Sequence, residues 1–171
     1  VADNVRGEIH VVGNTVVDAV YEHLELVEKR RSVLSGLGTE RNQYIVCTTH
    51  REENVDKKDK LESIFRAVSK AGYALNLPVY LPLHPRTRKR VEDFNLNGLL
   101  ESLANIRVID PLGYLDFLLF VANAALVLTD SGGIQEEACI HKVPCVTLRE
   151  NTERPETVDI GANVLAGIDE E

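Results

Sequence analysis

Short apolar runs alternate with amphipathic stretches along the whole chain, and this alternation limits the folds that the sequence can adopt. The apolar runs cover residues 8–12, 44–48, 78–83, 106–109, 124–128 and 144–148. Apolar residues at helical spacing follow them, as Leu61, Ile64 and Phe65 do after the second run. Strands that alternate with helices in this way predict an α/β fold with a doubly wound parallel sheet.

The first amphipathic stretch predicts a long helix. Thr15 and Asp18 are expected to form a weak capping pair at its start, and Gly36 and Gly38 to end it. Beyond the last run, residues 164–168 begin another apolar element. That late element and the lack of any methionine lead us to expect a piece of a longer protein.

Polar residues gather after the carboxyl ends of the predicted strands. They are His50, His84, Asp110, the turn at residues 130–133 and the loop at residues 149–154. Open α/β sheets bind their ligands at this edge. A single charged loop is usually solvated surface, but several at one edge favour a ligand site over that interpretation.

The segment at residues 129–138 reads as a strand end, a tight turn and a helix start. Ser131 is a good N-cap, and Gly132 and Gly133 leave the first helical N–H groups open to an anion such as phosphate. Glu137 lies one turn deeper on the same face, where its carboxylate could accept two hydrogen bonds from a ribose diol. Together these features indicate a nucleotide diphosphate site. The alternative is a well-capped helix without a ligand.

Two charged side chains near this edge suit phosphate chemistry. His50 could donate to a phosphate or act as a general acid, or it could simply cap the next helix. Arg154 could bind a diphosphate with its forked guanidinium, or form a surface ion pair with Glu153 or Glu156. Phe117 is placed to stack on a base, although an aromatic residue on such a helix is more often part of the core.

Composition narrows the classes of partner and site. The chain has 171 residues, which suits one domain, and a net charge of −8, which argues against nucleic acid and anionic membranes. Cys47, Cys139 and Cys145 show no CxxC spacing, so we expect reduced thiols in a soluble cytoplasmic protein. We expect neither a metal nor a cofactor. Because no GxxxxGK[ST] or GxGxxG motif occurs, an ATP P-loop and a dinucleotide fingerprint are not supported.

Four motifs in order carry a resemblance to a known family. They are the segments at residues 12–19, 49–54, 129–138 and 151–156. The chain resembles the C-terminal half of the non-hydrolysing UDP-N-acetylglucosamine (UDP-GlcNAc) 2-epimerases. The resemblance implies a GT-B-like architecture, in which two Rossmann-like domains face a cleft that holds a UDP-sugar. Residues 1–171 would then be the UDP-binding C-terminal domain, without the N-terminal domain and the final C-terminal helix.

The resemblance also implies roles for individual residues. His50 matches a histidine implicated in catalysis, by stabilising the departing UDP. The positions that match UDP contacts are Ser131, Gly132, Gly133, Glu137, Arg154 and Phe117. The family interconverts UDP-GlcNAc and UDP-ManNAc by eliminating and re-adding UDP. The carboxylates that move the C2 proton lie in its N-terminal domain, so this chain is expected to bind without turnover.

Regulation and assembly follow from the same resemblance. Bacterial members bind a second UDP-GlcNAc through residues matching Arg51, Glu53 and His84, which on local sequence alone could be ordinary loop residues. Leu112 stands where members often have a polar residue near the uracil. A homodimer is expected for the full-length protein. The alternatives are a GT-B glycosyltransferase, a hydrolysing epimerase and a non-catalytic UDP-sugar-binding module.

Overall fold

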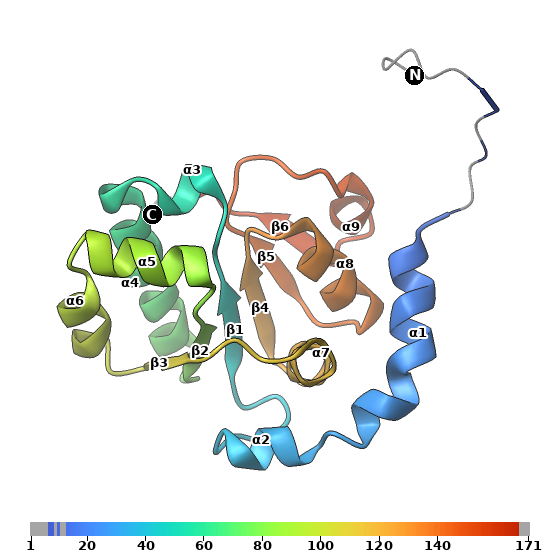
Figure 1. The fold of residues 1–171 in the computed structure, drawn as a ribbon, viewed down its shortest axis with the longest axis horizontal. Coiled ribbons are helices and arrows are strands. Elements are labelled where there is room, and N and C mark those ends of the chain that lie inside the picture. Colours follow the sequence, from blue (N-terminus) through green and yellow to red (C-terminus); the bar gives the residue numbers. More distant parts are fainter. Residues whose placement is uncertain (1–6, 9, 11–12, 168–171) are drawn as a thin grey trace.

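The computed structural model describes residues 7–8, 10 and 13–167, and its centre is one parallel sheet (Figure 1). Its strands are β1 Ile45–Thr48, β2 Val79–Pro82, β3 Ile106–Ile109, β4 Leu126–Thr129, β5 Cys145–Thr147 and β6 Asn163–Leu165. The spatial order is β3-β2-β1-β4-β5-β6, and all neighbours are parallel. This is the strand order of dinucleotide-binding α/β domains, so the doubly wound, Rossmann-like prediction is confirmed. The strand expected at residues 8–12 lies largely outside the described residues.

Helices cover both faces of the sheet because alternate strand residues point to opposite sides. They are α1 Thr15–Glu28, α2 Ser32–Gly36, α3 Glu52–Val55, α4 Lys58–Leu75, α5 Pro85–Asp93, α6 Asn97–Ser102, α7 Tyr114–Ala122, α8 Gly132–Ile140 and α9 Pro155–Asp159. Ile45 and Cys47 of β1 lie in a buried cluster with α4, α5 and α6. Val46 joins the cluster on the other face, with α7 and α8. No helix in the described ranges is both long and apolar enough to cross a membrane.

The long helix expected from Thr15 to Gly36 is wrong in two respects. The chain turns at residues 29–31, so α1 and α2 are separate helices. The apolar stripe of α1 ends at Val27, and the turn lets residues of α2 reach the cluster that α1 forms with α7. The N-cap is Asn14 rather than Thr15, because Asn14 has an extended backbone and its side chain accepts from Val16 N at 2.9 Å.

The strand order reverses between β1 and β4, and we call the region at the carboxyl ends of these two strands the crevice. These strands are neighbours, but the chain leaves β1 for α3 and α4 on one face and leaves β4 for α8 on the other. Thr48 and Thr129, their last residues, are register partners whose hydroxyl oxygens lie 2.6 Å apart. Diverging connections at adjacent strand ends leave room for a ligand.

Candidate functional site

The buried carboxylate of Asp130 joins the two sides of the crevice. It accepts hydrogen bonds from Thr49 Oγ1 at 2.8 Å, from the backbone N–H groups of His50 and Arg51 at 2.9 Å, and from Asn54 Nδ2 at 3.1 Å. Burial acts to raise its pKa, but the bonds from His50, Arg51 and Thr49 outweigh burial and hold the pKa below its usual value. Asp130 thus fixes the loop after β1 against the start of α8.

Asp130 also orients the imidazole of His50. The His50 Nδ1 atom lies 3.2 Å from Asp130 Oδ1, which leaves Nε2 as the ring nitrogen available to a ligand. The ring of His84 lies 5.1 Å from that of His50, between centroids. His84 is the N-cap of α5 and accepts from Arg86 N at 3.2 Å. Burial and the neighbouring His50 lower the pKa of His84.

The start of α8 faces the same crevice. Ser131 is its N-cap, as predicted, but the side chain makes no capping hydrogen bond to the helix. Gly132 and Gly133 are the first two helical residues, whose N–H groups have no acceptor within the helix. A Cβ added at Gly133 would meet no atom within 4 Å. The positive end of this helix is therefore open on the Gly133 side.

A carboxylate lies over the other glycine. The side chain of Glu153 lies 3.5 Å from the point where a Cβ on Gly132 would be. Arg51 and Arg149 both pair with it, and Arg149 also pairs with Glu53 at 3.1 Å. Burial acts to raise the pKa of Glu153, but these two arginines outweigh it and lower the pKa to about 2. Two guanidinium groups thus neutralise an anion beside the helix start, within a chain of negative net charge.

Glu137 lies one turn into α8 and is partly buried. Burial, and then the charge of Glu136, raise its pKa from the usual value to about 7. Tyr114 at the start of α7 is influenced by the charge of Glu137. Burial raises the pKa of its phenol, and the Glu137 charge raises it further. Phe117 is partly buried and packs against the cluster under α7 and α8, so its ring belongs at least in part to the core.

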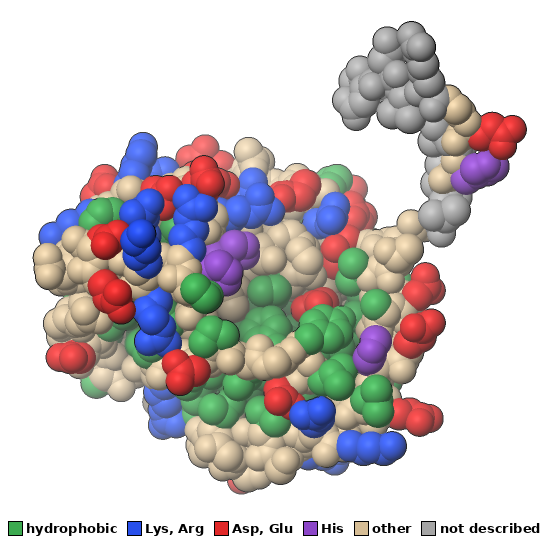
Figure 2. Space-filling view, viewed as in Figure 1, with side chains coloured by type: hydrophobic (Ala, Val, Ile, Leu, Met, Phe, Trp, Pro, Cys, Tyr) green, Lys and Arg blue, Asp and Glu red, His purple; other side chains and the backbone are tan. Residues whose placement is uncertain are grey.

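Arg154 pairs with a different residue than the sequence suggested. Its Nε atom lies 2.8 Å from Glu136 Oε1, so the alternative of a surface ion pair with Glu153 or Glu156 is not what forms. Glu136 is buried in α8, and this contact brings Arg154 to the start of the helix that carries Gly133. The contacts of Asp130 and Glu136 therefore place His50, the start of α8 and Arg154 at the same edge of the sheet. Figure 2 shows histidine side chains on one face of the molecule, beside basic and hydrophobic ones.

A buried amide anchors the loop at residues 149–154. Gln135 Oε1 accepts from Thr152 Oγ1 and from Asn163 Nδ2, which ties the loop and β6 to α8. Sequence reasoning placed Asp130 and Arg149 in polar segments at this edge without giving them a role, and it missed Gln135 and Glu136 as site residues. The available signal was the polarity of Asp130 and Gln135 directly after an apolar strand, because polar groups that the fold buries there need partners.

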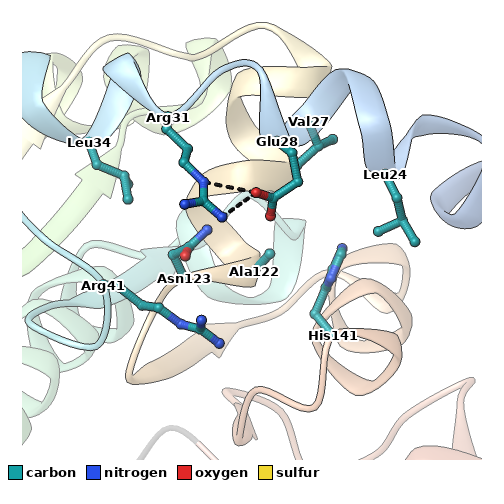
Figure 3. Close-up of a pocket in the computed structure, with 9 residues that line it drawn as sticks. All are labelled: Leu24, Val27, Glu28, Arg31, Leu34, Arg41, Ala122, Asn123 and His141. Atoms are coloured by element: carbon teal, nitrogen blue, oxygen red, sulfur yellow. Dashed lines mark hydrogen bonds and ion pairs between the residues drawn. The ribbon is translucent and has the colours of Figure 1, made fainter.

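A cavity of roughly 290 Å³ at the opposite edge of the sheet contains none of the predicted residues (Figure 3). Arg41, Asn123 and His141, which line it, all precede strands. Two of its charged side chains, Glu28 and Arg31, pair with each other. Among the described residues, no group of three or more His, Cys, Asp or Glu side chains is arranged to hold a metal.

Comparison with known proteins shows which family this chain resembles. The family model described as UDP-N-acetylglucosamine 2-epimerase matches residues 2–171. The UDP-N-acetylglucosamine 2-epimerase of Methanocaldococcus jannaschii is 48% identical over 97% of this chain and 46% of its own length. A crystal structure of that archaeal protein with UDP-GlcNAc and UDP has a TM-score of 0.87, covering 95% of this chain and 45% of that one.

A relative whose name contains a different sugar nucleotide is also similar in sequence to this chain. The UDP-2,3-diacetamido-2,3-dideoxy-D-glucuronate 2-epimerase of Pseudomonas aeruginosa is 45% identical over 72% of this chain and 33% of its own length. The chain thus spans less than half the length of these curated relatives. From the family match and the archaeal relative together, it belongs to the UDP-N-acetylglucosamine 2-epimerase family.

Proposed function

We propose that this chain is the UDP-binding half of an enzyme that interconverts UDP-GlcNAc and UDP-ManNAc. The observation that carries the proposal is the link through Asp130, which holds His50 and the start of α8 at one crevice. A phosphate at the start of a helix and an oriented histidine beside it suit a reaction in which UDP departs.

The diphosphate is proposed to lie on the first N–H groups of α8, at Ser131, Gly132 and Gly133. The helix dipole and the guanidinium of Arg154 would offset its charge. Glu137 would accept hydrogen bonds from the ribose hydroxyls, one turn further along the helix. Phe117 would lie beside the uracil with its exposed part.

His50 is proposed to assist the departure of UDP. In the elimination, the C2–H and C1–O bonds break, a C1–C2 double bond forms, and the C1–O electron pair goes to the UDP oxygen. The Nε2 atom of His50 would donate a hydrogen bond to that phosphate as charge develops. Re-addition of UDP with a proton on the other face of C2 completes the epimerisation. The groups that move this proton are proposed to come from the part of the protein outside this chain.

Three alternative functions would use the same site. A GT-B glycosyltransferase would need an acceptor, a hydrolysing epimerase would release free ManNAc, and a binding module would leave the sugar unchanged. Products from UDP-GlcNAc alone, formed by the full-length protein, separate them. The Pseudomonas aeruginosa relative adds a fourth possibility, a differently substituted UDP-sugar, which parallel incubation with that sugar nucleotide tests.

Regulation, assembly and location extend the proposal. A second UDP-GlcNAc is proposed at Arg51, Glu53 and His84, and the contact of His84 with His50 supports a link between the two sites. Each binding event would be visible as a separate step in a titration of the full-length protein. A homodimer is proposed for that protein. The free cysteines support a cytoplasmic location.

Calorimetric titration of this chain with UDP tests the core of the proposal. We expect a dissociation constant between micromolar and millimolar, roughly −8 to −4 kcal/mol, and weaker binding by Ser131→Ala and Glu137→Ala. Glu101→Gln, an exposed site on α6, is the control and leaves binding unchanged. A folded chain that gives no heat with UDP would contradict the assignment of UDP binding to this half.

A further inference from the structure

The buried side chain of Glu136 connects three parts of the site. Its Oε1 atom accepts a hydrogen bond from Asn14 Nδ2 and lies 2.8 Å from Arg154 Nε. Asn14 is the N-cap of α1, and Arg154 precedes α9, so the contacts join segments far apart in the sequence. Only 5% of Glu136 is exposed. We propose that Glu136 is a positioning residue for UDP-sugar binding, which aims Arg154 at the diphosphate and fixes α1 to the site. The inference rests on the function proposed above.

A purely structural carboxylate would be a poor choice at this position. Its second oxygen, Oε2, is buried and has no hydrogen-bond partner among the described residues. A buried charge with one unpartnered oxygen is costly, and apolar residues of similar size often stabilise such places better. The arrangement is explained if the charge serves ligand binding, because Glu136 then holds the guanidinium of Arg154 beside α8, together with the bond from Arg154 Nη1 to the Glu153 carbonyl at 3.2 Å.

Asn14 connects Glu136 to the start of α1. Its side-chain oxygen accepts from Val16 N at 2.9 Å, while its side-chain nitrogen donates to Glu136. One amide therefore both caps α1 and reaches the site residue. The sequence motif at residues 12–19 had no assigned chemistry, and this double use of Asn14 gives it a role. Displacement of the start of α1 would move Glu136, and with it Arg154.

Glu136 also acts on its neighbour Glu137. After burial, the Glu136 charge is the second cause that raises the Glu137 pKa to about 7. Tyr114 faces Glu137 from α7, and Arg154 faces Glu136 from the loop before α9. An ionised Glu137 accepts more hydrogen bonds from a ribose diol than a protonated one. UDP-sugar affinity should therefore rise as the pH increases through about 7.

The test is a calorimetric titration with UDP-GlcNAc between pH 5.5 and about 8.5. This ligand suits the purpose because its diphosphate is esterified at both ends and does not titrate near neutrality, unlike that of UDP. For Glu136→Gln, we expect about tenfold weaker binding at high pH, because Arg154 loses its partner charge. The pH midpoint of the affinity rise should also fall, because a like charge beside Glu137 has been removed.

Further variants separate positioning from folding. Asn14→Ala should weaken binding less and leave the midpoint unchanged, and Glu136→Asp should restore the midpoint in part. Glu101→Gln changes the net charge equally and should alter neither quantity. Thermal unfolding confirms that each variant is folded. A Glu136→Gln variant with unchanged or tighter binding, or with an unchanged midpoint, would overturn the inference.

The two proposals fail in different ways. If wild-type protein and Glu137→Gln both fail to bind UDP-GlcNAc, the UDP-binding function fails, and the role of Glu136 falls with it. If the wild type binds and Glu137→Gln weakens binding, while Glu136→Gln behaves like Glu101→Gln, only the positioning role is wrong.

Discussion

At Asp130, one side chain accepts hydrogen bonds from the loop after β1 and from α3, so its replacement tests how the crevice is held together. In Asp130→Asn, one acceptor oxygen becomes an NH₂ group that faces the donors of Thr49, His50 or Arg51. We expect a loss of about 2–4 kcal/mol in the free energy of unfolding, measured by urea denaturation. Thr49→Val, which removes a single donor, is the control and should cost less.

The stability of Asp130→Asn should also depend on pH differently from that of the wild type. Because the folded-state pKa of Asp130 lies below the unfolded value, its contribution is present above the unfolded pKa of about 4 and disappears as the pH falls through the folded value. Wild-type stability should therefore decrease below about pH 4 more steeply than that of Asp130→Asn. Parallel acid-induced unfolding curves for the two proteins would contradict this account of Asp130.

Gly133 allows the phosphate site to be separated from a simple helix cap. Because a Cβ there meets nothing within 4 Å, Gly133→Ala should stabilise the fold by roughly 0.5–1 kcal/mol. It should weaken UDP binding about tenfold, or roughly 1.4 kcal/mol, because a methyl group blocks close approach to the backbone. Gly98→Ala is a matched control, since Gly98 is also the second residue of a helix with open space around it.

Stability and affinity must be measured on the same samples for this comparison. Gly98→Ala should raise the thermal midpoint in the same direction as Gly133→Ala and leave the UDP affinity unchanged. If Gly133→Ala also leaves the affinity unchanged, the diglycine turn serves as a helix start and the diphosphate lies elsewhere.

Individual residues show how far the sequence could predict the site. His50 and Ser131 were identifiable because each follows an apolar run, and strand ends of a parallel sheet share one edge. Their partners were not identifiable, because Asp130 and His50 are separated by 80 positions and only the fold brings them together. The spacing of four residues from Gly133 selects Glu137 as a site residue, but no local feature shows what its neighbour Glu136 does. Only the packing of α8 decides that Arg154 pairs with Glu136 rather than with Glu137.

At the scale of elements, the close packing of α4 on β2 makes a sharp test. A Cβ at Gly72 would lie 2.6 Å from Asn105 Nδ2 and 2.7 Å from Val79 Cγ2. Gly72→Ala should therefore destabilise the protein by about 1–3 kcal/mol, because the strand or the helix must shift. UDP affinity should not change under conditions where the variant is folded, since the contact is remote from the crevice. Gly36→Ala on α2, which meets no atom, is the control.

Element boundaries follow from the same physics. The run at residues 106–109 coincides with β3, and the runs at residues 44–48, 78–83, 124–128 and 144–148 match β1, β2, β4 and β5 within two residues, because continuous apolar runs mark buried parallel strands. The edge strand β6 was placed less well. It begins at Asn163, a buried polar residue bonded to Thr147 and Gln135, and such a residue breaks the apolar pattern. The break between α1 and α2 was hidden for a similar reason, because only tertiary packing decides it.

At the scale of the whole molecule, the proposed site gathers groups suited to bind a UDP-sugar, whereas most of its carboxylates are unsuited to move a proton. Among the described residues along this edge, Asp130 accepts several hydrogen bonds, while Glu53 and Glu153 pair with arginines. Glu137 is assigned to the ribose. Carboxylates that are paired or accept several hydrogen bonds, such as Asp130, Glu53 and Glu153, are weak bases. Glu137 has a raised pKa of about 7, but it is proposed to bind the ribose rather than to face the sugar C2. Among the described residues along this edge, the imidazoles of His50 and His84 are then the candidates for removal of the C2 proton.

From these groups we predict that the chain binds UDP-GlcNAc but does not convert it to UDP-ManNAc. Incubation of the chain with saturating UDP-GlcNAc in deuterated water should give no deuterium at C2 and no UDP-ManNAc, as followed by proton NMR. The full-length UDP-N-acetylglucosamine 2-epimerase of Methanocaldococcus jannaschii is the positive control. Deuterium at C2 that disappears in folded His50→Ala would show that His50 removes the proton and that proton transfer resides in this half. Absence of exchange, with UDP-GlcNAc bound, is expected because His50 is proposed to face the departing phosphate, whereas proton removal needs a base positioned at C2.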